Sequence, residues 1–436
     1  MKTDRFGLSV STGQQAVIAA LDHFSTQLLL NGTQAGDILE AVKIYPDNLL
    51  LNCHSGILFL YTHDDADTRK AFPFLQAAQA LLPKNDQREQ LHYQAAYAWY
   101  EKDHDAAIRI YEKITQLWPR DCVAAKFAEW LFYCAGQVTH AERFLHMTTP
   151  MYPHNKHEPG FLATHSFALE LARHYDKSLE IAQQALALEA LTPWAHHTVA
   201  HTLMACSDID RGIMLMEGYQ PLWKKILPPL AGHLTWHLAL FYLAQLDEQK
   251  VLAQFSPGIW GGMPELSLEQ IDAIALLWRM ELADMPQDHL LKQVTEKLGQ
   301  HVYQQYIGFD TAHYVYALAR MGHTESVQKI ITAAQAFAQH SAPAYQELWL
   351  NSGVPLFKGI SAFAQGHYKE ANLHFAMILP IMAQVGGSDA QIEVFYQTAM
   401  VSLLRAGEKD KAHVLLKQYL PYYVPTKIGQ RWMQGC

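Results

Sequence analysis

A helix-turn-helix pattern recurs along this chain with a period of about 34 residues. A small residue stands early in the second helix of each unit, at Ala107, Ala141, Ser178 and Gly212, at intervals of 34, 37 and 34 residues. Looser units carry Ser326, Ala371 and Ala412 at the same place. Because a small side chain lets the second helix approach the first closely, the pattern predicts stacked helical hairpins. No run of alternating residues indicates a set of strands.

The period and residue types resemble the tetratricopeptide repeat. Tyr111 follows Ala107 by four residues, where it can fill the next gap between helices, and Pro119 ends the unit. The resemblance implies an all-α chain of helix-turn-helix repeats, forming one right-handed superhelix with a concave pocket. We expect capping helices in residues 1–85, core repeats in 86–254 and further helical repeats, continuous with the core, in 270–436. The segment 255–269 holds two prolines and three glycines, which predicts an irregular loop.

Composition excludes several function classes. The 436 residues carry a formal net charge of −9 and no basic run longer than Lys224-Lys225, which argues against nucleic-acid binding. No apolar stretch approaches the roughly 18–20 residues that a membrane span needs. The N-terminal sequence lacks a signal-like apolar segment. Five cysteines without a Cys-x-x-Cys spacing are typical of reduced cysteines, so we expect a cytoplasmic protein.

Two His-x-x-x-His pairs, His197/His201 and His233/His237, stand in neighbouring repeats. A spacing of four places both histidines of a pair on one helix face, so two such helices could bring four imidazoles to one cavity. Trp194 and Trp236 lie close to the pairs in sequence. We therefore predict one shared site that contains the four histidines and both tryptophans.

The resemblance to tetratricopeptide repeats implies which positions of each first helix face the concave groove. In that register the groove holds titratable and aromatic residues: Glu89, His92, Lys126, Trp130, Tyr133, Glu170, Trp194, His197, His201, His233 and Trp236, with His237 beside them. Such a mixture is typical of a small-molecule pocket, where a few polar groups orient a ligand among aromatic walls. We also expect a groove histidine to support little packing, so that His197→Ala leaves folding nearly intact.

Three interpretations of the histidine pairs remain open. The four histidines could bind a divalent metal such as zinc or iron, could act as general acids or bases together with Glu89 and His92, or could be structural. Neither HTVAH nor HLTWH contains the glutamate of the H-E-x-x-H metalloproteases. The chain has no G-x-S-x-G, Walker A or G-x-G-x-x-G motif. We expect binding of, and chemistry on, a small molecule or short peptide; the alternative is a non-enzymatic scaffold that grips a partner protein.

Longer motifs resemble the tetratricopeptide repeat protein 38 family. They are WAHHTVAH (194–201), HLTWHLAL (233–240) and GGSDAQIEVF (386–395), with weaker matches at GLSVST (7–12) and REQLH (88–92). The resemblance implies that both histidine pairs and their tryptophans belong to the family's pattern. It also implies site roles for Arg88, Glu89 and His92, and for Asp389 and Gln391 at the start of a late helix.

Overall fold

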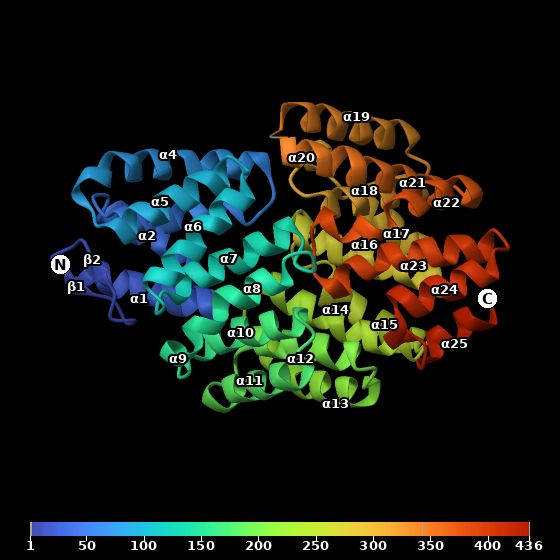
Figure 1. The fold of residues 1–436 in the computed structure, drawn as a ribbon, viewed down its shortest axis with the longest axis horizontal. Coiled ribbons are helices and arrows are strands. Elements are labelled where there is room, and N and C mark those ends of the chain that lie inside the picture. Colours follow the sequence, from blue (N-terminus) through green and yellow to red (C-terminus); the bar gives the residue numbers. More distant parts are fainter. Residues whose placement is uncertain (1, 342, 436) are drawn as a thin grey trace. The chain divides into compact units, whose positions relative to one another are not determined.

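The computed structural model describes residues 2–341 and 343–435, and in this part of the chain nearly all regular structure is helical. Contacts divide the chain into two units. Unit 1 comprises residues 1–202 and 221–230, and unit 2 comprises residues 203–220 and 231–436. Figure 1 shows both as arrays of paired helices. The predicted all-α repeat fold is therefore confirmed, while the superhelical course of the whole array stays a prediction.

Unit 1 begins with a short antiparallel ribbon, in which Lys2 pairs with Val10, and continues as helices. Its elements are β1 (Lys2–Thr3), β2 (Ser9–Val10), α1 (Gln15–Leu29), α2 (Ile38–Ile44), α3 (Leu49–Leu60), α4 (Asp65–Leu81), α5 (Gln87–Tyr100), α6 (His104–Leu117), α7 (Cys122–Ala135), α8 (Ala141–Thr148), α9 (Tyr152–Asn155), α10 (Pro159–Leu171), α11 (Tyr175–Leu188) and most of α12 (Pro193–Ala205).

Unit 2 contains the later helices. They are α13 (Ile209–Tyr219), α14 (Pro228–Ala244) from Ala231 on, α15 (Glu248–Gln254), α16 (Ser267–Leu282), α17 (Asp288–Thr295), α18 (Gly308–Arg320), α19 (Thr324–His340), α20 (Pro343–Leu348), α21 (Val354–Ala364), α22 (Tyr368–Ile378), α23 (Asp389–Arg405), α24 (Lys409–Tyr419) and α25 (Lys427–Gln434). Between α15 and α16 the chain is irregular apart from one π-helical turn, Phe255–Ile259, with non-helical dihedral angles at Ser256 and Pro257.

The small residues of the repeat pattern are buried, apart from one in a looser unit. Ala107, Ser178, Ala371 and Ala412 are completely buried, and Ala141 and Gly212 are buried as well. Tyr111 is also completely buried, as its place in the pattern predicts. Ser326, in one of the looser units, is half-buried. Close packing at these positions explains why the pattern demands small side chains.

The turn between the two helices of most hairpins contains one residue with a left-handed backbone. Arg173 between α10 and α11 has φ 64°, and Gly366 between α21 and α22 has φ 80°. Both close the end of a helix in the way that a left-handed C-terminal cap does. Glycine adopts this conformation at little cost, whereas other residues are strained in it. The turn geometry is thus imposed by the repeat, even where the local residue does not favour it.

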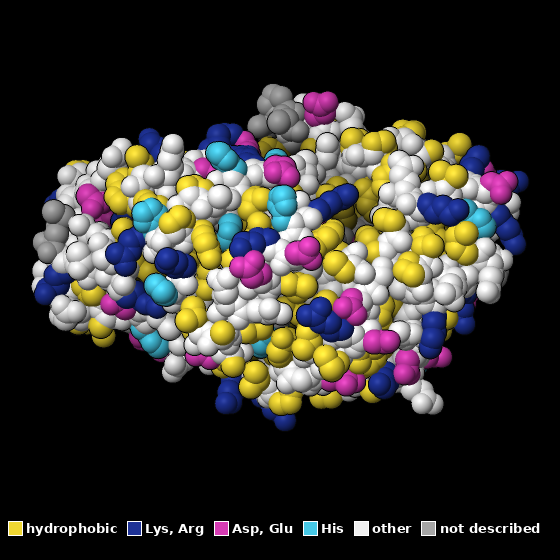
Figure 2. Space-filling view, turned by 60° about the horizontal axis from the view of Figure 1, so that its bottom comes forward, with side chains coloured by type: hydrophobic (Ala, Val, Ile, Leu, Met, Phe, Trp, Pro, Cys, Tyr) yellow, Lys and Arg dark blue, Asp and Glu magenta, His cyan; other side chains and the backbone are white. Residues whose placement is uncertain are grey.

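The surface carries no large basic area on the face drawn in Figure 2, where Lys and Arg side chains alternate with acidic and hydrophobic ones. Among the described residues no helix has both the length and the apolar character of a membrane span.

Candidate functional site

The histidine pair of unit 1 projects from one face of α12. The Nε2 atoms of His197 and His201 lie 3.2 Å apart. On the other side of the His201 ring, Nδ1 lies 3.7 Å from a carboxylate oxygen of Glu170 on α10. All three side chains are buried, with at most 2 % of their surface exposed. Glu170, which the sequence predicts as a groove residue, therefore lies close to this pair within unit 1.

Trp194 continues this cluster by one turn of α12. Its ring stacks on the imidazole of His197, with centroids 4.3 Å apart and planes inclined by 15°. Its indole N–H donates to the carboxylate of Glu129 on α7, which also accepts from the ammonium group of Lys126. The Lys126 ammonium lies 4.0 Å from the Trp194 ring centroid. Burial raises the pKa of Glu129, and the bonds from Lys126 and Trp194 oppose that rise.

The histidine pair of unit 2 repeats this geometry on α14. The Nε2 atoms of His233 and His237 are again 3.2 Å apart. Nδ1 of His233 lies 3.0 Å from a carboxylate oxygen of Asp272 on α16. Trp236 stacks on His233 with centroids 5.3 Å apart and planes inclined by 12°. Each pair thus has one stacked tryptophan and one carboxylate facing a ring nitrogen, but only in unit 2 do both contact the same histidine, with the carboxylate at hydrogen-bond distance.

A buried arginine joins this second cluster to α23. The guanidinium carbon of Arg279 lies 5.1 Å from the Trp236 ring centroid. Nη2 of Arg279 donates to the backbone oxygens of Ala390 and Gln391, at 2.7 and 3.0 Å. Arg279 therefore attaches the first turn of α23, where the predicted residues Asp389 and Gln391 lie, to α16.

Gln391 also has a structural task at this helix start. Its side-chain oxygen accepts from the backbone N–H of Ser388, whose hydroxyl accepts from the Gln391 N–H in return. This reciprocal pair is a capping box, which satisfies two backbone donors at a helix start. The bonds account for Gln391 structurally, and its ligand-binding role stays a prediction.

Arg88, Glu89 and His92 on α5 contact the N-terminal segment and α7. Arg88 donates to Asp121 and to the backbone oxygen of Ser9, each at 2.8 Å. Glu89 accepts from the backbone N–H of Ser11 at 2.8 Å. His92 Nε2 lies 2.9 Å from the same Asp121 carboxylate. These bonds fasten the chain before α1, and a catalytic or ligand-binding role for these residues stays a prediction.

Trp130 and Tyr133, also predicted groove residues, lie one turn apart on α7 with ring centroids separated by 5.1 Å. Trp130 also packs against Tyr61 and His63, with centroid separations of 4.9 and 5.4 Å. They belong to an aromatic cluster of unit 1 that includes residues ahead of the predicted core repeats.

The expectation that a groove histidine supports little packing is wrong for His197. Only 2 % of His197 is exposed, and its ring contacts Phe167 as well as Trp194, with a centroid separation of 5.0 Å from Phe167. The resemblance to tetratricopeptide repeats does not give the degree of burial, because burial depends on side chains from neighbouring helices, and the groove-facing orientation stays a prediction.

Three important residues were missing from the sequence-based prediction: Glu129, Asp272 and Arg279. Each is a charged residue within a mostly buried helix, and at most 6 % of each is exposed. The sequence could have indicated these residues, because a charged residue in an otherwise apolar helix is rarely buried without a partner. The shared four-histidine site concerns residues of two units and stays a prediction.

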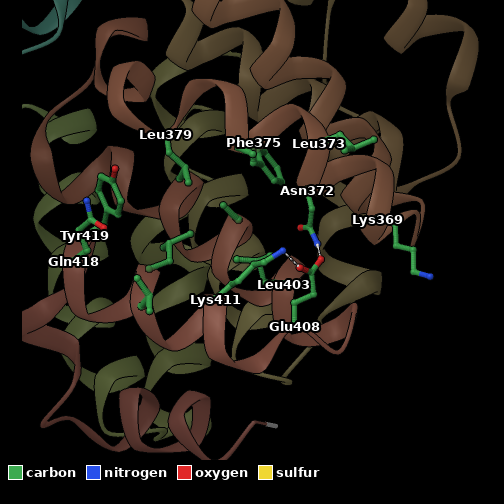
Figure 3. Close-up of a pocket in the computed structure, with 14 residues that line it drawn as sticks. Lys369, Asn372, Leu373, Phe375, Leu379, Leu403, Glu408, Lys411, Gln418 and Tyr419 are labelled. Atoms are coloured by element: carbon green, nitrogen blue, oxygen red, sulfur yellow. Dashed lines mark hydrogen bonds and ion pairs between the residues drawn. The ribbon is translucent and has the colours of Figure 1, made fainter.

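Unit 2 also has a groove of about 560 Å³ between α22 and α24, shown in Figure 3. Its walls are mainly apolar and include Leu373, Phe375 and Leu379. At its rim Glu408 accepts from Lys411 and Asn372. None of the predicted site residues lines this groove.

The comparisons with known proteins leave the chain without a family assignment. No protein-family model matches it. One similar solved structure is that of Naa15/Naa10 bound to HypK-THB. The match has 12 % sequence identity and a TM-score of 0.26, and covers 92 % of this chain and 67 % of that one.

Proposed function

We propose that this chain is a helical-repeat binding protein in which a His-x-x-x-His pair binds a divalent metal ion, zinc or iron. The metal and the adjacent tryptophans would then hold a small molecule or the end of a short peptide. The observation that carries the proposal is the 3.2 Å separation of the two Nε2 atoms, which recurs in both pairs.

This separation suits two ligands of one ion. Zinc bound tetrahedrally at about 2.0–2.1 Å from each nitrogen holds two ligand nitrogens about 3.3 Å apart. A single N–H···N hydrogen bond between the imidazoles would give a similar distance. The metal interpretation is favoured because two histidines with facing Nε2 atoms occur twice, in different repeats, and each pair has a stacked tryptophan and a nearby carboxylate.

The carboxylates support the same interpretation. A metal-binding histidine usually donates its second ring N–H to a carboxylate, which sets the tautomer and directs the other nitrogen toward the ion. Asp272 lies 3.0 Å from Nδ1 of His233, at hydrogen-bond distance, and Glu170 lies 3.7 Å from Nδ1 of His201, on the same side of that ring. In both cases Nε2 is the nitrogen left to face the other histidine of the pair.

An ion with an open coordination position would polarise a bound group or lower the pKa of a bound water, which are the means of metal-assisted catalysis. We further propose membership of the tetratricopeptide repeat protein 38 family and a cytoplasmic location, on the sequence motifs and cysteine pattern given above.

A partner-binding scaffold is the second candidate, favoured by the apolar groove of unit 2, where Leu373 and Val414 are 71 % and 63 % exposed.

Metal titration tests the proposal. Chelator-treated protein is titrated with Co²⁺, whose absorption spectrum reports tetrahedral coordination, and with Zn²⁺ by calorimetry. His201→Gln and His237→Gln should each weaken binding by about 10-fold or more, because each removes one ligand. His313→Gln is the matched control, since His313 is fully buried but its Nδ1 lies 2.9 Å from the backbone oxygen of Phe309.

The number of metal ions bound per chain shows which histidine pair binds metal. Two ions per chain would assign one ion to each pair, and a single ion would belong to the pair whose His→Gln variant, His201→Gln or His237→Gln, loses it. If the protein is purified without metal and Co²⁺ produces no tetrahedral spectrum, metal binding is excluded and the scaffold becomes the leading candidate.

A further inference from the structure

The two tryptophans of the histidine clusters each lie between an imidazole and a cation. In unit 1 the cation is the ammonium group of Lys126, 4.0 Å from the Trp194 ring centroid. In unit 2 it is the guanidinium group of Arg279, 5.1 Å from the Trp236 ring centroid. Both contacts are cation–π interactions, which strengthen where water is excluded. The two units can therefore be compared residue by residue.

They differ in what the cation and the indole bind. In unit 1 one carboxylate, that of Glu129, accepts from both Trp194 Nε1 and Lys126 Nζ. In unit 2 neither Trp236 Nε1 nor Arg279 Nε has an acceptor among the described residues. Trp236 is completely buried and Arg279 is 1 % exposed, so these donors are also removed from bulk water. A buried donor without an acceptor carries a large desolvation cost.

Three of the four other donors of Arg279 bond to uncharged groups, namely the backbone oxygens of Ala275, Ala390 and Gln391. Burial lowers the pKa of the Arg279 guanidinium, and the more distant carboxyl groups of Glu393 and Asp272 oppose that change. Glu393 accepts from the hydroxyls of Tyr422 and Tyr423, and Asp272 faces His233. Arg279 is therefore a buried cation to which no carboxylate of the described residues bonds directly, an arrangement that is costly unless an anion is bound.

We propose that Trp236 and Arg279 of unit 2 bind a carboxylate group of the ligand. The ligand would accept from the indole N–H and the guanidinium, as Glu129 accepts from the indole and the ammonium in unit 1. This inference rests on the proposed function, because Trp236 also stacks on His233, but it uses different atoms. Arginine suits the role, since its Nε–H is a charged donor and the guanidinium keeps its charge when buried.

Binding to metal-free protein tests this carboxylate site apart from the metal site. Calorimetry with succinate and its neutral analogue succinamide tests small carboxylates. A tripeptide with a free C-terminus and the same tripeptide as its amide test peptide ends. One acid should bind while its amide does not. Trp236→Phe, which keeps the stacked ring but removes the N–H, should weaken that binding by about 10-fold, the usual cost of losing a hydrogen bond to a charged group.

One control variant shares the chemical change. Trp278→Phe alters another fully buried tryptophan, the residue before Arg279 in the sequence, whose indole N–H also has no acceptor among the described residues. It should leave the affinity for the acid unchanged. Arg279→Lys keeps a charge, and a thermal melt of each variant separates lost binding from lost folding. Since Arg279 also holds α23, Trp236→Phe is the decisive variant.

Equal binding of acid and amide, no binding of either acid, or an unchanged affinity in Trp236→Phe would overturn the inference. If the acids bind only when Zn²⁺ is present, and His237→Gln abolishes binding while Trp236→Phe does not, the carboxylate belongs to the metal. That result would reject the Trp236–Arg279 site while supporting the proposed function.

Discussion

The two glycines of α13, Gly212 and Gly218, should respond in opposite ways to replacement by alanine. A Cβ atom on Gly212 would lie 2.2 Å from Cε1 of Phe241, whereas ordinary contact begins at 3.4 Å. The ring would have to withdraw by 1.2 Å, the difference between 3.4 and 2.2 Å. Phe241 is completely buried, so the ring has no free space to enter. Nothing lies within 4 Å of a Cβ built on the exposed Gly218.

These distances set the expected magnitudes. Overpacking a core position costs about 1–3 kcal/mol, and alanine regains up to about 1 kcal/mol over glycine inside a helix. Gly212→Ala should therefore lower the free energy of unfolding by about 1–2 kcal/mol. Gly218→Ala has only the helix-propensity gain, so it should raise that free energy by about 0.5–1 kcal/mol.

Hydrogen exchange of α13 and α14 peptides, with urea unfolding followed by circular dichroism, would measure both effects. Exchange is needed because a chain of two units need not unfold in one step. Phe241→Leu in the Gly212→Ala background should recover part of the loss, since the smaller side chain makes room. If both alanine variants shifted stability in the same direction, our placement of α13 against α14 would be refuted.

Three further predictions concern other parts of the chain. His197→Ala should cost about 1–3 kcal/mol of stability in urea unfolding, because the ring is buried between aromatic side chains, and a cost under about 0.5 kcal/mol would restore the open-groove interpretation. Arg173→Gly should raise the melting temperature and Gly366→Ala should lower it, each by the equivalent of about 1 kcal/mol, because both residues have a left-handed backbone; unchanged melting in both would contradict this. Burial raises the pKa of the Glu393 carboxyl from 4.5 to about 7. Between these pH values the folded state keeps a proton that the unfolded state releases. The free energy of unfolding should therefore fall as pH rises from about 4.5 to about 7, and then level off. Urea midpoints across this pH range should show that Glu393→Gln removes roughly 2–3 kcal/mol of the fall, and an identical slope in the variant would show that another group is responsible.

The sequence by itself determined the fold class and the helical hairpins. Small residues at Ala107, Ser178 and Gly212 recur because two helices cannot approach closely with larger side chains between them. The His-x-x-x-His spacing likewise determined that the histidines of each pair adjoin, since residues four apart share a helix face. Both results depend only on helical geometry and on neighbours close along the chain.

Only the tertiary structure decided which groups complete each cluster. Glu129 contacts Trp194 across 65 residues, and Asp272 faces His233 across 39. The contrast between the two tryptophans is likewise visible only after folding. The indole N–H of Trp194 donates to a carboxylate, whereas that of Trp236 has no acceptor among the described residues. Such partners come from other repeats, and a repeat pattern sets the face of a helix without stating which side chain of the next helix meets it. Burial, and with it the pKa of Glu393 and the cost of removing His197, follows from those long-range contacts.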